Sequence, residues 1–374
     1  MHGIGDRSKH EGTLPREIDA SGSLDGARRQ RPAQIRYLYE RHPEGAETFE
    51  VAPGILWARV PLPFRLDHVN VWLVRDTDGW TLIDTGTASP GARAVWETLL
   101  GGVLSGAPIV RLIGTHGHTD HVGLAGWLHG IADEAPYHIS LIEWQSARLR
   151  LDEAKAPVPK SAMRFLGAHG CDSDSIQGFA DDRRHAHAYL EPLPDQIQRI
   201  SEGTRLVFGG REWQAMVCGG HASAHVSLWC EADRILIAGD QILSKITPMI
   251  GVNPHEPDAD SLTEYLTSLD RFRALAADAL VLPSHGLPFH GLRTRADELA
   301  HHHELRLNEL EVMMAGPENA MRLAHGLFPK AVAGGHARHA FAETLAHAHH
   351  LVTLGRAVRL ERDGGYLFQA TSRT

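Results

Sequence analysis

The chain has 374 residues, of which 43% are hydrophobic, which is enough for one large domain or two smaller ones with a sizeable core. Its formal net charge of -9 gives no overall basic surface of the kind that nucleic-acid-binding proteins use. Three cysteines, Cys171, Cys218 and Cys230, are too few for a disulfide framework, so we expect reduced thiols and a cytoplasmic protein.

The beginning of the chain differs in composition from the rest. Residues 1–35 are rich in Gly, Ser, Arg and Asp and poor in large apolar side chains, which predicts a mobile tail. No charged segment is followed there by an apolar one, so we expect no signal peptide. No apolar run is long enough to cross a bilayer, and we expect no contact with membranes.

Short strands separated by turns are predicted from about residue 54 onward. The apolar or β-prone segments are residues 55–60, 69–75, 80–83, 109–113 and 137–142. Asp76-Thr77-Asp78-Gly79 is a hairpin turn signal between two of them. Residues 91–100 have a helical pattern, so this half of the chain mixes strands with helices.

Residues 143–198 interrupt this rhythm. The segment combines short helical patterns with four prolines, and it is too long for a simple connection. It therefore predicts a helical insertion. Because long insertions beside a site often form pocket walls, we expect its larger apolar residues to line a pocket. These residues are Met163, Phe165, Leu166, Phe179 and Tyr189. Strand patterns then return at residues 204–208, 212–217, 227–230, 234–237 and 279–282, with a helix at 261–275.

The last part of the chain is mainly helical. Residues 294–314 predict a long amphipathic helix, and residues 318–327 and 341–353 predict two more. Asp363-Gly364-Gly365 separates two short apolar segments, which predicts a hairpin. This order of elements predicts a winged-helix-like module over residues 294–374, after a catalytic domain over residues 36–293.

One short motif indicates a metal site. Thr115-His116-Gly117-His118-Thr119-Asp120-His121 follows an apolar strand and precedes an apolar, helix-like segment. A turn at the end of a strand can direct several side chains at one point. Neutral imidazoles together with a carboxylate suit zinc or a similar first-row metal. The alternative, a loop of solvent-exposed histidines, is a poor match for these apolar flanks.

Three further candidate ligands each follow a predicted strand. His221 comes after Cys218-Gly219-Gly220, Asp240 after Ala238-Gly239, and His285 after Pro283-Ser284. We expect these strand ends and the histidine motif to line one edge of a sheet sandwich.

With these residues in place, the sequence resembles the metallo-β-lactamase-fold hydrolases over roughly residues 54–288. The resemblance also includes Leu82-Ile83-Asp84-Thr85-Gly86 and implies an α+β fold, an αββα sandwich with helices outside two mixed sheets. It implies that His116, His118 and His221 bind one metal and that Asp120, His121 and His285 bind a second. Asp240 would bridge the two, together with a water or hydroxide. Zinc is the expected metal, and manganese or iron remain open because mixed His/Asp sites are not selective by ligand type alone.

Other residues near the motifs are expected to take part in catalysis or to support the site. Asp120 is the expected catalytic residue, which would orient the nucleophile or pass its proton to the leaving group. Asp84 is expected to hold a ligand loop, with a plain turn residue as the alternative. His225 is expected to be a buried, hydrogen-bonded histidine rather than a ligand. Cys218 is expected to be a small buried residue, although thiolates bind zinc well.

The resemblance implies hydrolysis but not the substrate, since one fold supports many reactions. We expect a dinuclear hydrolase that uses a metal-bridging hydroxide on a thioester, ester or lactone, as glyoxalase II-like enzymes do. The winged-helix-like tail resembles that of lactamase-β-like endoribonucleases and leaves a metal-dependent endoribonuclease or phosphodiesterase as an alternative. A non-enzymatic nucleic-acid-binding protein is a further alternative. We expect a small-molecule or acyl substrate rather than nucleic acid, and a homodimer remains open.

Overall fold

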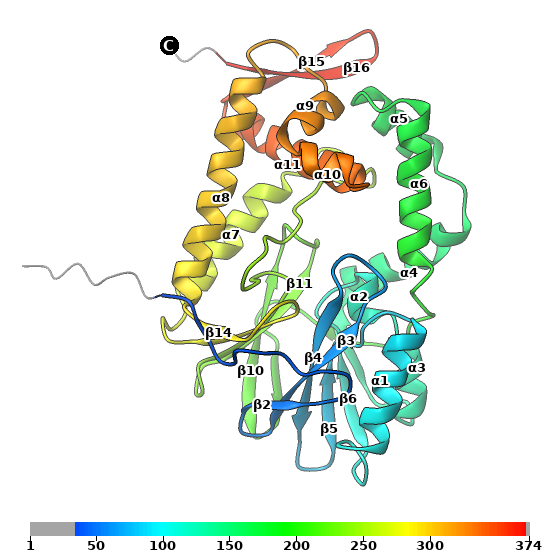
Figure 1. Ribbon diagram of the computed structural model, residues 1–374, viewed down its shortest axis with the longest axis vertical. Helices are drawn as coiled ribbons and strands as arrows, with labels where there is room; N and C mark the ends of the chain where they lie inside the picture. Colours follow the sequence, from blue (N-terminus) through cyan, green and yellow to red (C-terminus); the bar gives the residue numbers. More distant parts are fainter. Residues whose placement is uncertain (1–33, 372–374) are drawn as a thin grey trace, which may run out of the picture. The chain divides into compact units, whose positions relative to one another are not determined.

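Two seven-stranded mixed sheets are present in residues 34–371, the part of the chain that this computed structural model describes (Figure 1). In the first sheet the strands run in chain order: β2 (Phe49–Ala52), β3 (Ile55–Pro61), β4 (His68–Arg75), β5 (Trp80–Ile83), β6 (Ile109–Ile113), β7 (Tyr137–Ser140) and β8 (Gln198–Ile200). The second sheet has the order β1 (Arg36–Tyr37), β14 (Phe289–His290), β13 (Leu280–Pro283), β12 (Ile235–Gly239), β11 (His225–Cys230), β10 (Arg211–Cys218) and β9 (Arg205–Phe208).

A hydrophobic core holds the two sheets face to face. It combines side chains of the first sheet, such as Trp57 and Trp72, with side chains of the second, such as Trp213 and Ile237. The rings of Trp57 and Trp72 are stacked with their centroids 6.4 Å apart. Because these large apolar side chains are almost fully withdrawn from water, they contribute strongly to the stability of the sandwich.

Helices cover the outer face of each sheet. The first sheet is covered by α1 (Pro90–Gly101) and α3 (Ala125–Ile131), whose Trp96 and Leu128 are fully buried. The second is covered by α7 (Ser261–Arg273) and α8 (Leu292–Met313), which bury Phe272 and Leu299. The predicted αββα sandwich is therefore confirmed.

The predicted helical insertion consists of α4 (Leu141–Lys155), α5 (Lys160–Ala168) and α6 (Ser173–His187). The strand predicted over residues 137–142 was too long, because β7 ends at Ser140. The hydroxyl of Ser140 accepts a hydrogen bond from the Glu143 backbone N–H at 3.3 Å, which caps α4. Leu141 and Ile142 are consequently the first residues of a helix.

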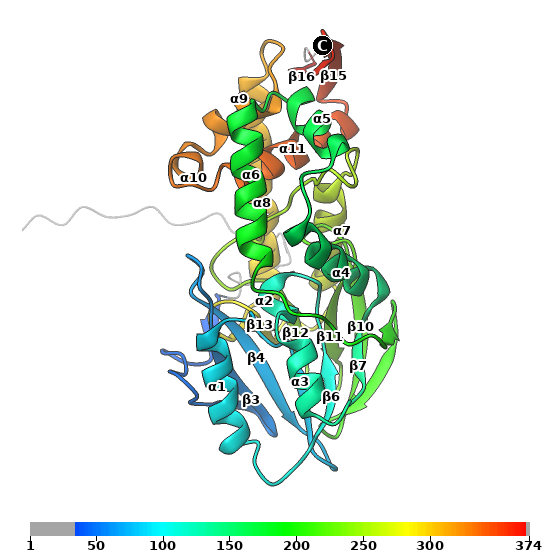
Figure 2. The same cartoon turned by 90° about the vertical axis from the view of Figure 1, so that its right-hand side faces the viewer.

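The end of the chain contains the predicted helices and hairpin. These elements are α9 (Ala320–Leu327), α10 (Pro329–Ala333), α11 (Ala337–Thr353), β15 (Ala357–Arg362) and β16 (Gly365–Ala370). Helices α5 and α6 of the insertion lie beside them (Figure 2). The ring of Phe179 on α6 is 5.8 Å from that of Phe341 on α11, within a core that extends to the second sheet. Classification of residues 294–374 as a winged-helix-like module remains a prediction.

Two further expectations concern the N-terminal tail and membrane-spanning segments. Of the tail predicted over residues 1–35, only the last two residues are described, and Ile35 packs against the core. No helix within residues 34–371 combines the length and the apolar character needed to cross a membrane.

Candidate metal centre

The ends of several strands meet at one edge of the sandwich. Strands β5 and β6 are parallel, and so are β12 and β13. Strand β10 also runs in the direction of β12, because each is antiparallel to β11. The backbone N–H of Val226 in the second sheet donates to the Thr115 carbonyl of the first at 2.8 Å. Loops that follow these strands therefore come together, as predicted.

The first cluster of imidazoles is formed by His116, His118 and His221. The His116 Nε2 atom lies 2.9 Å from His118 Nδ1 and 3.3 Å from His221 Nε2. The His221 Nδ1 atom lies 3.0 Å from the Met249 carbonyl, to which it donates. This bond leaves the Nε2 lone pair of His221 free for a metal.

The second cluster lies next to the first and contains Asp120, His121 and His285. Asp120 and His121 belong to the short helix α2 (Thr119–Val122). The Nε2 atoms of His121 and His285 are each 3.5 Å from Asp120 Oδ2. The His285 Nδ1 donates to the carbonyl of His68 at 2.7 Å, which fixes the orientation of the ring.

Asp240 lies between the two clusters. Its Oδ2 is 3.3 Å from His221 Nε2 and 3.5 Å from His121 Nε2. Its Oδ1 is 3.3 Å from His285 Nε2. The structure thus brings together all the predicted ligands: His116, His118, Asp120, His121, His221, Asp240 and His285.

These donor atoms fit a pair of metal ions. Within residues 34–371, the buried atoms His121 Nε2, His285 Nε2 and Asp240 Oδ1 have no hydrogen-bond partner. Burial lowers the pKa of His116 well below its usual value, so this imidazole is neutral. Burial opposes ionisation of Asp240, but His285 and His121 hold its pKa well below the usual range. Burial lowers the pKa of His121 and His285, but Asp120 and Asp240 outweigh it and raise the pKa of His121 well above its usual value and that of His285 to about 9. Neutral imidazoles and ionised carboxylates are the forms that bind metals, so these two histidines would lose a proton when ions bind.

Asp84 is hydrogen-bonded to the histidine motif. One carboxylate oxygen accepts from the backbone N–H of Thr115, and the other accepts from the Thr115 hydroxyl and from His121 Nδ1, all at 2.8 Å. Its backbone φ is +60°, a left-handed conformation that aspartate adopts more readily than most residues. The carboxylate therefore fixes the loop and directs the Nε2 of His121 toward Asp120 and Asp240.

His225 and Cys218 are buried, as predicted. The Nε2 of His225 accepts a hydrogen bond from the Asp240 backbone N–H at 3.0 Å, and burial lowers the pKa of this histidine to about 3. His225 therefore positions the Asp240 backbone while staying neutral. Burial raises the pKa of the Cys218 thiol to about 12, so it is not a thiolate near neutral pH.

The supporting role of three residues near the centre was not predicted from the sequence. Glu143 accepts from the backbone N–H groups of Gly117 and Ala224, each at 2.8 Å, and so joins the two loops that carry His116, His118 and His221. The Asn70 side chain donates to the carbonyls of Pro283 and Gly286, on either side of His285. His68 holds His285 through its carbonyl. Ser140-x-x-Glu143 matches a capping-box pattern, but this signal predicts a helix start and not a link between loops.

The expected apolar pocket wall is not formed by most of the residues named for it. Phe165, Leu166 and Phe179 are at most 9% exposed and pack in the core shared with the C-terminal helices. Tyr189 packs edge-on against Phe64, with ring centroids 5.5 Å apart. These side chains therefore attach the insertion to the rest of the molecule. The helical pattern of α5 was recognised in the sequence, but not that of α6 or the surface that these helices cover.

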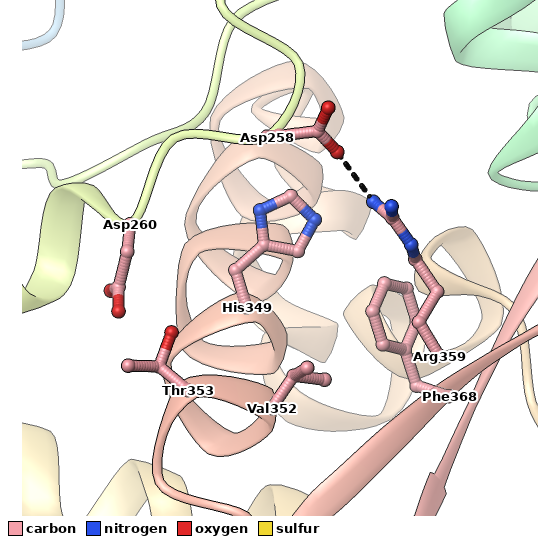
Figure 3. Close-up of a pocket in the computed structure, with 7 residues that line it drawn as sticks. All are labelled: Asp258, Asp260, His349, Val352, Thr353, Arg359 and Phe368. Atoms are coloured by element: carbon pink, nitrogen blue, oxygen red, sulfur yellow. Dashed lines mark hydrogen bonds and ion pairs between the residues drawn. The ribbon is translucent and has the colours of Figure 1, made fainter.

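A separate pocket of about 260 Å³ lies between α11 and the hairpin (Figure 3). It contains none of the predicted metal ligands, and its lining includes Asp258, His349 and Arg359. Asp258 and Arg359 form an ion pair with an oxygen–nitrogen distance of 2.7 Å. Because these two charges are paired with each other, neither is free to bind a charged ligand in the pocket.

Comparison with known proteins identifies the family. The metallo-β-lactamase superfamily model matches residues 64–285. The crystal structure of a β-lactamase domain protein from Burkholderia ambifaria is 35% identical with a TM-score of 0.82, covering 90% of this chain and 98% of that one. The metallo-β-lactamase family protein TTHA1429 from Thermus thermophilus is 28% identical with a TM-score of 0.74, covering 86% and 100%. The probable metallo-hydrolase YqjP of Bacillus subtilis (strain 168) is 27% identical over 294 residues, 74% of this chain and 85% of that protein. The chain belongs to the metallo-β-lactamase superfamily.

Proposed function

We propose that the chain is a dinuclear metal-dependent hydrolase that acts on a thioester, ester or lactone. Its ligands would be His116, His118 and His221 for one ion, Asp120, His121 and His285 for the other, and Asp240 for both. Two ions held there would make hydroxide available near neutral pH and would stabilise negative charge on a substrate oxygen. Zinc is the preferred metal, with manganese or iron as alternatives.

The observation that carries this proposal is the set of buried donor atoms without hydrogen bonds. Within the described residues, His121 Nε2, His285 Nε2 and Asp240 Oδ1 have no such partner, although each residue is otherwise firmly held. Leaving several buried polar atoms unsatisfied is costly. Metal ions at this position would remove the cost.

In this proposal Asp120 handles the protons. Burial opposes its ionisation, but His121 holds the pKa of this carboxyl well below its usual value. An ionised carboxylate can accept a hydrogen bond from an attacking water and orient it toward a substrate carbonyl. In this proposal Asp120 takes the proton that the attacking water loses and passes it to the leaving group.

Arginines beside the histidine motif suggest a negatively charged substrate. Arg150 on α4 donates to the Gly117 carbonyl at 3.0 Å. Arg183 and Arg338 each have a buried guanidinium nitrogen without a hydrogen-bond partner among the described residues. Burial lowers the pKa of Arg338, Asp182 raises it, and Arg150 and Arg183 lower it further, so three guanidinium groups lie near one another here. We propose that this region binds an anionic part of the substrate, away from the bond that is hydrolysed.

A substrate panel with matched variants tests the proposal. The metal-loaded protein is assayed on anionic acyl thioesters, neutral esters, lactones, phosphodiesters and single-stranded RNA, with His118→Ala as the inactive control. We expect thioester, ester or lactone turnover that His118→Ala abolishes. Arg338→Gln should raise KM roughly tenfold for anionic substrates and not for neutral ones. The exposed Arg362→Gln variant should leave KM unchanged for both anionic and neutral substrates.

The second candidate function is phosphodiester hydrolysis, since guanidinium groups also bind phosphates. Metal-dependent cleavage of phosphodiesters or RNA without any ester turnover would replace the first proposal with this one. RNA binding without any hydrolysis would favour the non-enzymatic alternative and contradict both.

A further inference from the structure

A second group of metal-binding side chains lies outside the centre described above. His303 is on α8, whereas Glu343 and His347 are one turn apart on α11. Residues four positions apart share a face of a helix. Helices α8 and α11 pack against each other, so the three side chains meet between them. We infer that His303, Glu343 and His347 form a second metal site, which joins α8 to α11.

The distances suit a shared ion. His303 Nδ1 and His347 Nε2 are 3.1 Å apart, and one donor atom from each of the three residues lies within 4.8 Å of the others. Two nitrogens that each lie about 2.0–2.1 Å from a tetrahedral zinc are roughly 3.3 Å apart. The corresponding nitrogens of His116 and His221 in the main centre are 3.3 Å apart.

The ring of His347 is oriented for binding. Its Nδ1 donates to the backbone carbonyl of Glu343 at 2.7 Å, one turn earlier in the helix. The Nε2 atom therefore carries the lone pair, and this atom faces His303. A hydrogen bond from the distal ring nitrogen to a carbonyl is the usual support of a metal-binding imidazole.

The charges also favour a cation. Both imidazoles are fully buried, and burial lowers the pKa of His303 to about 2 and that of His347 to about 4, so both are neutral. Burial raises the pKa of Glu343 to about 7. Within residues 34–371, its carboxylate has no hydrogen bond or ion pair. A divalent cation would hold this carboxylate in its ionised form.

The groups that surround His303, Glu343 and His347 contact other partners and do not take the place of the ion. Arg306, a cation near Glu343, is hydrogen-bonded to Glu309 at 2.6 Å. His350, on the same helix, is 2.8 Å from the Thr263 hydroxyl. The edge of the Tyr265 ring packs against His303, with centroids 5.4 Å apart. Two histidines and one glutamate form a common zinc donor set, with a fourth position for water.

Metal analysis combined with crystallography tests this site. The protein is loaded with zinc, desalted and analysed for zinc per chain, and crystals are measured at the zinc absorption edge. We expect three ions per wild-type chain, with one anomalous peak between His303, Glu343 and His347. His303→Gln and His347→Gln should each lose one ion and this peak alone. Glu343→Gln, which is nearly isosteric, should bind that ion at least tenfold more weakly.

The matched control is His349→Gln, which changes a buried histidine of α11 that bonds the Ala259 carbonyl and is not part of the group. It should retain all three ions. Anomalous peaks confined to the main centre of the wild-type protein would overturn the inference, and this measurement does not depend on any variant folding. Peaks only between α8 and α11 would instead contradict the proposed dinuclear centre.

Discussion

At the scale of single residues, buried carboxylates fix the loops on which the candidate metal-binding histidines lie. Asp84 satisfies two hydrogen bonds from Thr115 and one from His121. Glu143 satisfies the backbone of Gly117 and of Ala224. Neither carboxylate belongs to the clusters of metal-binding groups, yet both determine where the ligands point. Changes at these positions should therefore affect metal binding without removing a ligand.

Asp84→Asn should weaken metal binding while the fold is retained. Asparagine tolerates the positive φ at this position, but its amide group would replace one acceptor with a donor. His121 would lose its fixed orientation, and we expect a loss of about 10–100-fold in metal affinity. Competition with a fluorescent chelator measures this loss, and the exposed Glu97→Gln is the control. Unchanged affinity in Asp84→Asn would mean that other contacts hold His121.

Glu143→Gln should destabilise the metal-free protein. The amide can accept from only one of the two backbone N–H groups, which leaves the other buried without a partner. We expect a decrease of about 1–3 kcal/mol in the free energy of unfolding. Urea denaturation measures it, with the exposed Glu361→Gln as the control. A change no larger than that of the control would show that water satisfies these groups.

At the scale of elements, most interior strands were predictable, whereas β14 and several edge strands were not. β4 and β5 are apolar or β-prone runs around a clear turn, so their composition reveals them. β1, β2 and β8 have two to four residues, and a partner strand rather than their own sequence makes them strands. The helix α6 was not recognised as such, since its residues are mostly polar and it is held by packing against α4, α5 and α11.

The insertion and the C-terminal helices should stabilise each other. Phe341 is 2% exposed and packs against Phe179, in the core that also reaches the second sheet. Phe341→Ala should lower the free energy of unfolding by about 3–5 kcal/mol. Denaturation followed by tryptophan fluorescence measures this change, and the exposed Val358→Ala should alter it by no more than about 0.5 kcal/mol. A similarly small effect of Phe341→Ala would contradict a shared core.

At the scale of the whole molecule, the site depends on which strands end at the same edge. All seven candidate ligands were found in the sequence because each one lies just after a strand, in a local pattern of His, Asp and Gly. The contacts that join distant loops were not predictable in this way. Glu143 and Ala224 are 81 positions apart, and His68 and His285 are 217 apart. Only the folded sandwich brings these pairs together.

The region proposed to bind an anionic part of the substrate is also formed at this scale. Arg150, Arg183 and Arg338 come from α4, α6 and α11, so the insertion and the C-terminal helices jointly supply positive charge beside the histidine motif. Nothing in the local sequence around any one of these arginines indicates this grouping.

The central claim, a dinuclear hydrolytic centre, is tested most directly by metal titration of the chelator-treated His347→Gln variant. This variant removes the inferred second site, so every bound ion can be assigned to the main centre. Zinc is added in steps while bound metal and hydrolysis of a thioester are measured together. We expect activity to reach its maximum at two ions per chain and Asp240→Ala, in the same background, to abolish it. Full activity at one ion per chain, with Asp240→Ala unimpaired, would contradict the dinuclear centre.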